Sequence, residues 1–111
     1  MDARAEYDAL LARAGTPLDQ FNPGSGAYAL DRRVAVEAIE ALHGTNRVIL
    51  GGDVVRIVEG RLQYTDSWFV ERKSTESDAS FATRSREYAR RHVEGVWSPS
   101  DWVPLFVLVV R

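Results

Sequence analysis

The sequence has no cysteine among its 111 residues, which excludes disulfide scaffolds, thiolate zinc sites and cysteine nucleophiles. It also has no long hydrophobic run. The longest apolar stretch, Leu105–Val110, is far shorter than the roughly 20 residues of a membrane-spanning helix. No apolar segment follows the acidic first residues, so we expect no signal peptide. These absences predict a cytoplasmic protein that does not enter a membrane.

Neither sign of charge dominates, because 14 basic residues stand against 16 acidic ones and the formal net charge is -2. This balance argues against a nucleic-acid-binding protein that works through bulk positive charge. Hydrophobic residues make up 45% and charged residues 27%, which is the usual globular mixture and excludes wholesale disorder. At this length we expect residues 1–111 to form a single domain whose core needs no disulfide or metal.

Two helices are predicted in the first part of the chain, with a loop over residues 16–28 between them. Apolar residues recur at helical spacing from Tyr7 to Ala14, and Gly15 follows as a stop. Asp31 is a good N-cap for the second helix. The apolar side of that helix is formed by Ala35, Ala38, Ile39 and Leu42.

Strand-like patterns follow the second helix. Residues 47–50 form a short strand that ends at Gly51-Gly52, where two glycines favour a bulge or bend over a ligand contact. Glu59-Gly60 then joins two further strands, 53–58 and 61–65, as a two-residue turn, which sets Val55 opposite Tyr64. We expect the face that carries Val55, Ile57, Leu62 and Tyr64 to be buried. The face that carries Val54, Arg56, Gln63 and Thr65 is half-polar and is expected to be wet.

The remaining sequence completes a predicted α+β fold. Residues 68–73 form a further strand, and a third helix is expected from about Asp78 to Glu94. The buried side of this helix is predicted to consist of Phe81, Ala82, Ser85, Tyr88, Ala89, His92 and Val93. The apolar run 103–110 reads as a C-terminal strand that is covered on both faces, near the centre of a mostly antiparallel sheet.

Asp53 and Asp66 are the sharpest chemical candidates, because the hairpin register places them opposite each other. Two facing carboxylates indicate an acid/base pair, a metal site or an acidic patch for a basic partner. The alternative is a bulge at Gly51-Gly52 or Asp66-Ser67 that separates them, with each aspartate capping a turn, and we favour it because turn-flanking aspartates are common.

Other side chains suggest contacts rather than chemistry. Four arginines, Arg84, Arg86, Arg90 and Arg91, are predicted on the outer side of the third helix, as a phosphate or acidic-partner contact or as a solvated face. Neither histidine has the i+4 partner of a helix-borne metal site. Trp97 and Trp102 lie in irregular sequence and are either core or interface anchors, whereas Trp68 next to Phe69 is expected to pack in the core.

The block 48–55, Val-Ile-Leu-Gly-Gly-Asp-Val-Val, resembles the immunity protein 40 family of bacterial polymorphic toxin systems. The hairpin, the following Asp66-Ser67-Trp68-Phe69 and the terminal Phe106-Val107-Leu108-Val109 are also similar to that family. Tyr28-Ala29-Leu30-Asp31 resembles its entry to the second helix, so the resemblance covers residues 25–111. The family-like positions are Gly51, Gly52, Asp53, Trp68 and Glu71.

The resemblance implies a small cytoplasmic protein that binds and neutralises one cognate toxin domain, without catalysis, cofactor or metal. We predict a partner-binding set made of Asp53, Asp66, Trp68, Glu71, Trp97 and Trp102. One rival is a carboxylate-site, metal-dependent enzyme or ligand-binding domain built on Asp53, Asp66 and Glu71. Another is a nucleic-acid or regulatory partner that works through the arginine helix. The exposed edge of the sheet and a wet face with Val54 and Val58 would also allow a homo-oligomer.

Overall fold

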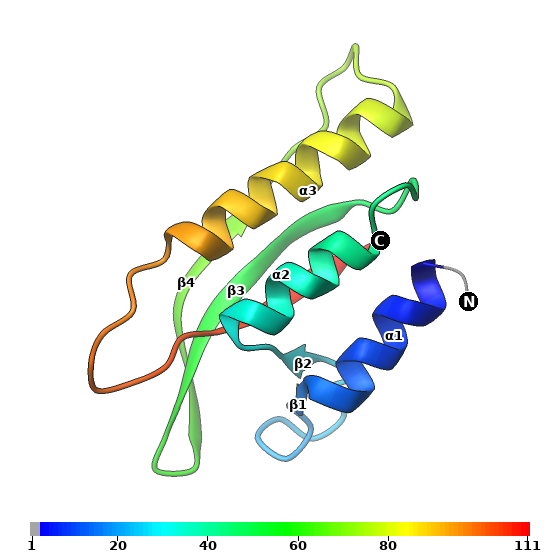
Figure 1. Cartoon of the computed structure of the whole chain (residues 1–111). Coiled ribbons are helices and arrows are strands. Elements are labelled where there is room, and N and C mark those ends of the chain that lie inside the picture. Colours follow the sequence, from blue (N-terminus) through cyan, green and yellow to red (C-terminus); the bar gives the residue numbers. More distant parts are fainter. Residues whose placement is uncertain (1–2) are drawn as a thin grey trace.

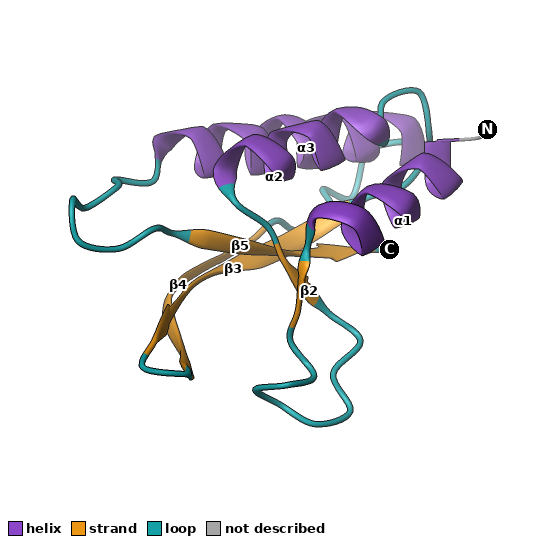
Figure 2. Cartoon of the chain, turned by 60° about the horizontal axis from the view of Figure 1, so that its bottom comes forward, coloured by secondary structure: helices purple, strands orange, loops and turns teal. Residues whose placement is uncertain are grey.

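The computed structural model describes residues 3–111 and confirms an α+β fold. A three-stranded antiparallel sheet with the order β4-β3-β5 carries the helices on one side (Figures 1 and 2). The helices are α1 (Ala3–Ala14), α2 (Arg32–Ala41) and α3 (Asp78–Gly95). The strands of this sheet are β3 (Ile49–Val58), β4 (Arg61–Phe69) and β5 (Leu105–Val110).

The predicted loop between α1 and α2 contains a small second sheet. Its strands are β1 (Thr16–Pro17) and β2 (Tyr28–Ala29), which pair antiparallel. Leu30, directly after β2, exchanges backbone hydrogen bonds of 2.8 and 2.7 Å with Phe106 of β5. These bonds attach the β1–β2 segment to β5, and the loop between β1 and β2 projects on the side of the sheet away from the helices (Figure 2).

Local sequence signals explain how α2 begins and how β3 and β4 are joined. Asp31 is extended and its side chain accepts a 2.8 Å hydrogen bond from the Val34 N–H, which confirms the predicted N-cap. Glu59 and Gly60 have φ angles of 52° and 76°, the positive values that a type I′ turn requires. This turn sets the predicted pairing of Val55 with Tyr64.

Three predictions about strands were wrong. Residues 49–50 and 53–58 form one strand, β3, that continues through Gly51-Gly52, and only residues 68–69 of the predicted strand 68–73 form a strand, as the end of β4. β5 lies at an edge of the sheet, and β3 lies at its centre. Within β5, Phe106 is buried on the helix side, under α2, and Val107 is buried on the opposite side, against the β1–β2 segment. The other residues of β5 are only partly covered or exposed.

The prediction of the buried and wet faces of the hairpin was also wrong. Val54, placed on the wet face, is 1% exposed beneath the helices, while Tyr64, placed on the buried face, is 61% exposed. Val55 is buried too, against Leu18 and Ala29 of the β1–β2 segment. The central strand is thus covered on both sides, a tertiary arrangement that alternation along one hairpin does not reveal. Because Val54 is buried, it offers no surface for the predicted oligomer contact.

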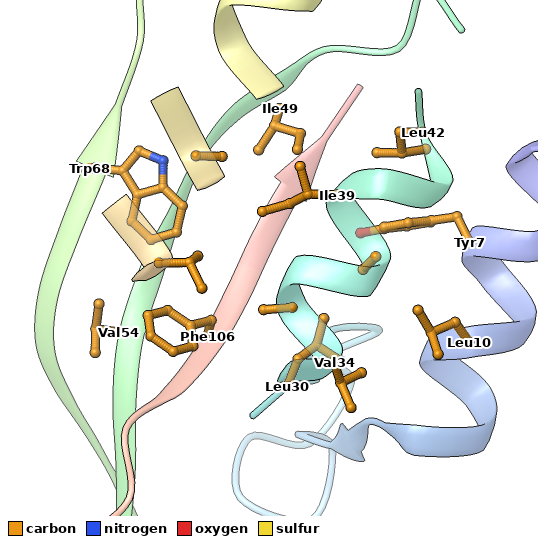
Figure 3. Packing of buried hydrophobic residues seen from close by; sticks show 14 residues of the cluster. Tyr7, Leu10, Leu30, Val34, Ile39, Leu42, Ile49, Val54, Trp68 and Phe106 are labelled. Carbon is orange, nitrogen blue, oxygen red and sulfur yellow. The ribbon is translucent and has the colours of Figure 1, made fainter. Parts of the chain in front are cut away.

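The main core fills the layer between helices and sheet (Figure 3). Phe106 and Val54 lie near Trp68 over the sheet, Ile39 of α2 lies over β5, and Leu42, directly after α2, belongs to the same cluster. The predicted apolar side of α2 is confirmed, because Ala35, Ala38, Ile39 and Leu42 are all buried.

Helix α3 buries five of the seven predicted side chains, namely Phe81, Ala82, Ser85, Ala89 and Val93, while His92 is half-buried. Tyr88 is 41% exposed, whereas Arg86 is buried. The Arg86 guanidinium donates hydrogen bonds of 3.1 and 3.2 Å to the carbonyls of Thr45 and Arg47, and its burial lowers its pKa. An arginine that satisfies loop carbonyls in this way holds α3 against the entrance to β3, and a pattern of apolar residues does not predict it.

Tyr7 makes the contact between α1 and α2 sensitive to alkaline pH. Burial raises its pKa to about 12, from an ordinary value of about 10. The folded state therefore favours the neutral phenol, and this contribution to stability is complete below pH ~10 and is lost as the pH rises toward ~12. We expect the wild-type chain to lose about 2 kcal/mol more than Tyr7→Phe between pH 8 and pH 11.5 in urea denaturation. Equal losses would contradict this assignment.

Candidate partner-binding surface

The six predicted partner-binding residues do not form one site. Asp53 lies on the side of the sheet away from the helices, because it is two residues from Val55 along an uninterrupted stretch of β3. Trp68 lies on the helix side and is only 7% exposed, so it belongs to the core and offers a partner little surface. Asp66 shares the helix side with Trp68.

Asp53 and Asp66 do not pair, and the favoured prediction that a bulge separates them is confirmed, although the bulge lies at Thr65 and not at Gly51-Gly52 or Asp66-Ser67. A register shift between Val54 and Val55 pairs Asp53 with Ser67 and Val54 with Asp66. The additional residue in β4 is Thr65, whose hydroxyl donates to the Val54 carbonyl at 3.1 Å. Because this bulge turns the two aspartates to opposite faces, it removes the geometric basis of the carboxylate-site enzyme.

Gly51 and Gly52 provide space for β4 and its tryptophan. A Cβ at Gly51 would lie 2.1 Å from the Trp68 carbonyl oxygen, and one at Gly52 would lie 2.4 Å from Cη2 of the indole. The register of β3 against β5 also shifts between Ile49 and Gly51, which confirms a bulge beside the glycines. The family-like glycines and Trp68 are therefore explained by packing.

Asp66 belongs to a cluster with His92 of α3. One carboxylate oxygen lies 3.3 Å from His92 Nε2, and the imidazole stacks on Trp68 with ring centroids 4.5 Å apart. Within the described chain, His92 Nε2 has no hydrogen-bond partner. Its contact with Asp66 is an ion pair only when the imidazole is protonated. The indole N–H of Trp68 is buried and has no acceptor among residues 3–111.

The other three candidates lie in loops. Trp97 is 79% exposed in the segment between α3 and β5. Trp102, in the same segment, is half-buried and lies 5.3 Å from the Arg56 guanidinium of the hairpin. Glu71 follows β4 and is exposed, and its backbone carbonyl accepts a 2.6 Å hydrogen bond from Arg84.

The arginines of α3 are largely engaged within the chain. Arg84 forms a two-pronged contact of 2.6 Å with the Glu76 carboxylate. That hydrogen bonding lowers the pKa of Glu76 to about 2, with further help from the Lys73 backbone N–H. Arg90 binds Glu40 of α2 and Glu94 at 2.6 Å each. Since Arg86 is buried, three of the four arginines serve the fold, which weakens the prediction of a basic binding helix.

An aromatic and apolar surface remains on the side of the sheet away from the helices, and we call it the open face. Its strand positions are fixed by pairing, because paired residues point to the same side. Phe69 is 72% exposed there and Tyr64 61%, and Val109 of β5 is 47% exposed. The positions around Asp53 on this face are Gly51, Val55, Tyr64, Ser67, Phe69, Leu105, Val107 and Val109.

Sequence reasoning missed Phe69 and Val109 and took Tyr64 for a core residue. The signal was present in part, because the hairpin register already placed Tyr64 and Asp53 on one face. It could not be used, because which face the helices cover depends on tertiary packing.

The described residues hold no group of three or more histidine, cysteine, aspartate or glutamate side chains that could bind a metal ion. Among the helices of residues 3–111, none is both long and apolar enough to cross a membrane.

A model of the family described as immunity protein 40 matches residues 17–110. No curated protein and no solved structure matches the chain. The matched range includes β2 to β5, the glycine pair with its tryptophan, and every strand of the open face. The chain therefore belongs to the immunity protein 40 family.

Proposed function

We propose that this immunity protein neutralises its toxin by covering it with the open face. Membership of the family implies neutralisation of a cognate toxin by binding, in a family that is typically non-catalytic. The observation that supports the open face as the docking surface is the exposure of Phe69 and Tyr64. Aromatic side chains are enriched at protein interfaces, because they bury a large area and lose little conformational entropy. The cytoplasmic location predicted from the sequence is part of the same proposal.

The shape of the molecule supports this surface. The tip of the β3–β4 hairpin and the β1–β2 loop both project from the sheet on the side opposite the helices (Figure 2). Tyr64 lies toward the hairpin end of the open face, and Phe69 and Val109 lie beside Gly51 toward its opposite end. A partner domain that contacts these residues binds a rigid sheet, which limits the entropy lost on binding. Of the six predicted residues, Asp53 is the one that lies on this surface.

A binding measurement with paired aromatic variants tests the proposal. The probe is the C-terminal domain of the protein encoded immediately upstream of this chain, carrying an inactivating substitution. By calorimetry, we expect the double variant Phe69→Ala, Tyr64→Ala to bind about 100-fold more weakly than wild type, because both anchors are lost. Protection of cells that express the active toxin should fall in parallel.

Tyr88→Ala is the matched control, because Tyr88 is an exposed aromatic residue on α3, on the helix side of the molecule. Its affinity should stay within about twofold of wild type. If the double variant binds normally while Trp97→Ala binds weakly, the α3–β5 loop is the docking surface and the open face is not. Absence of any complex with the wild-type chain would contradict neutralisation of this toxin by binding.

A further inference from the structure

From the position of Asp53, we infer that the toxin inserts a basic side chain, best an arginine, into the centre of the open face. This inference rests on the proposed function and names the chemistry of the group that the surface recognises. The juxtaposition behind it is a half-buried carboxylate encircled by uncharged positions on a face with exposed aromatic residues.

Asp53 is the central charge of this face. It pairs with Ser67 on β4 and with Val107 on β5, so it lies on the middle strand between both neighbours. Phe69 and Val109 flank it toward one end, where Gly51 contributes no side chain. None of the positions around it is basic, and within residues 3–111 the Asp53 side chain has neither a hydrogen bond nor an ion pair.

Several other carboxylates of the chain do have cationic partners. Glu76 binds Arg84, and Glu40 binds Arg90, each at 2.6 Å. The basic residue of β3, Arg56, cannot serve Asp53. It lies on the opposite face, where it donates a 2.7 Å hydrogen bond to Gln63 and covers Trp102.

Docking of a partner on this face changes the surroundings of Asp53. In the free protein Asp53 is only half-buried, and water can solvate its carboxylate. A toxin that covers Phe69, Tyr64 and Val109 removes that water, and a buried carboxylate without a counter-charge opposes binding strongly. A complementary cation on the toxin converts this penalty into specificity, since a partner without the cation leaves the charge unpaired.

The neighbours of Asp53 favour a guanidinium over an ammonium group. A planar guanidinium donates two parallel hydrogen bonds to a carboxylate and also stacks on aromatic rings. Phe69 and Tyr64, on the adjacent strand, offer such rings on the same face. The toxin residue is therefore expected to be an arginine surrounded by apolar residues.

The test compares Asp53→Asn with Asp8→Asn, using the same inactivated toxin domain. Each change removes one negative charge and keeps the size of the side chain, and Asp8 is exposed on α1, on the helix side. We expect Asp53→Asn to raise the Kd about 30-fold or more and to reduce the dependence of binding on NaCl, while Asp8→Asn stays within about threefold. Equal melting temperatures of wild type and variants would show that folding is preserved.

Alanine replacement of each toxin arginine then identifies the partner. One of these toxin variants should bind the wild-type chain more weakly than the unmodified toxin domain does. The same toxin variant should bind Asp53→Asn almost as well as the unmodified domain does, because the pair is already broken, and this coupling is the signature of a direct contact. If Asp53→Asn binds as wild type while the Phe69→Ala, Tyr64→Ala variant binds weakly, the toxin docks on the open face but inserts no basic side chain at Asp53. If both bind as wild type, the open face itself is wrong. Weak binding of Asp53→Asn without a coupled toxin arginine or lysine would also overturn the inference.

Discussion

Replacing Gly52 with alanine is expected to lower the free energy of unfolding by about 3 kcal/mol, because the new methyl group has no space. Its Cβ would lie 2.4 Å from Cη2 and 2.7 Å from Cζ2 of Trp68, and 2.6 Å from the Val107 carbonyl oxygen. The indole cannot retreat freely, since His92 stacks on it. Urea denaturation followed by circular dichroism would measure the loss.

Gly26→Ala is the matched control for this change, because a Cβ there meets nothing within 4 Å. It should alter stability by less than about 0.5 kcal/mol. Trp68→Phe supplies an internal check, since phenylalanine lacks the Cη2 and Cζ2 atoms that meet the new methyl group. Gly52→Ala should therefore cost less in the Trp68→Phe background than in wild type. Equal costs in both backgrounds would show that the indole does not exclude a side chain at this position.

Phe106→Ala is expected to destabilise the fold by about 3–5 kcal/mol, since it removes a fully buried ring from the main core. Phe106 lies between the sheet and α2 (Figure 3), and Arg32 of α2 lies 5.8 Å from its ring. The backbone hydrogen bonds of residue 106 with Leu30 remain possible in the variant. The loss therefore reports side-chain packing, and chemical denaturation would measure it.

Val109→Ala on the same strand is the control, because Val109 is 47% exposed on the open face. We expect a cost below about 1 kcal/mol there. A similar cost at both positions would mean that β5 is not anchored through its helix-facing side.

Much of the local structure follows from the sequence. Asp31 caps α2 because its carboxylate is well placed to accept from the Val34 N–H, and Glu59-Gly60 forms the turn because Gly60 accepts a positive φ at no cost. These interactions join residues that are neighbours in the chain, so composition and spacing are sufficient to predict them. The family resemblance was predictable for the same reason, because its motifs are short and local.

Three features depended on tertiary structure. The bulge at Thr65 separates Asp53 from Asp66, and nothing in the alternating pattern of β4 marks it. The buried guanidinium of Arg86 is explained only by the carbonyls of Thr45 and Arg47, some 40 positions earlier in the chain.

The partner-binding surface also required the assembled fold. The sequence by itself determined that Asp53 and Tyr64 share a face, because side chains alternate along paired strands. Only the packing of α2 and α3 on one side of the sheet decided that the helices leave the other face uncovered. Tyr64 and Phe69 of β4 and Val109 of β5 are exposed there. The physical reason is that burial depends on which elements meet across the sheet, and those contacts join residues far apart in the sequence.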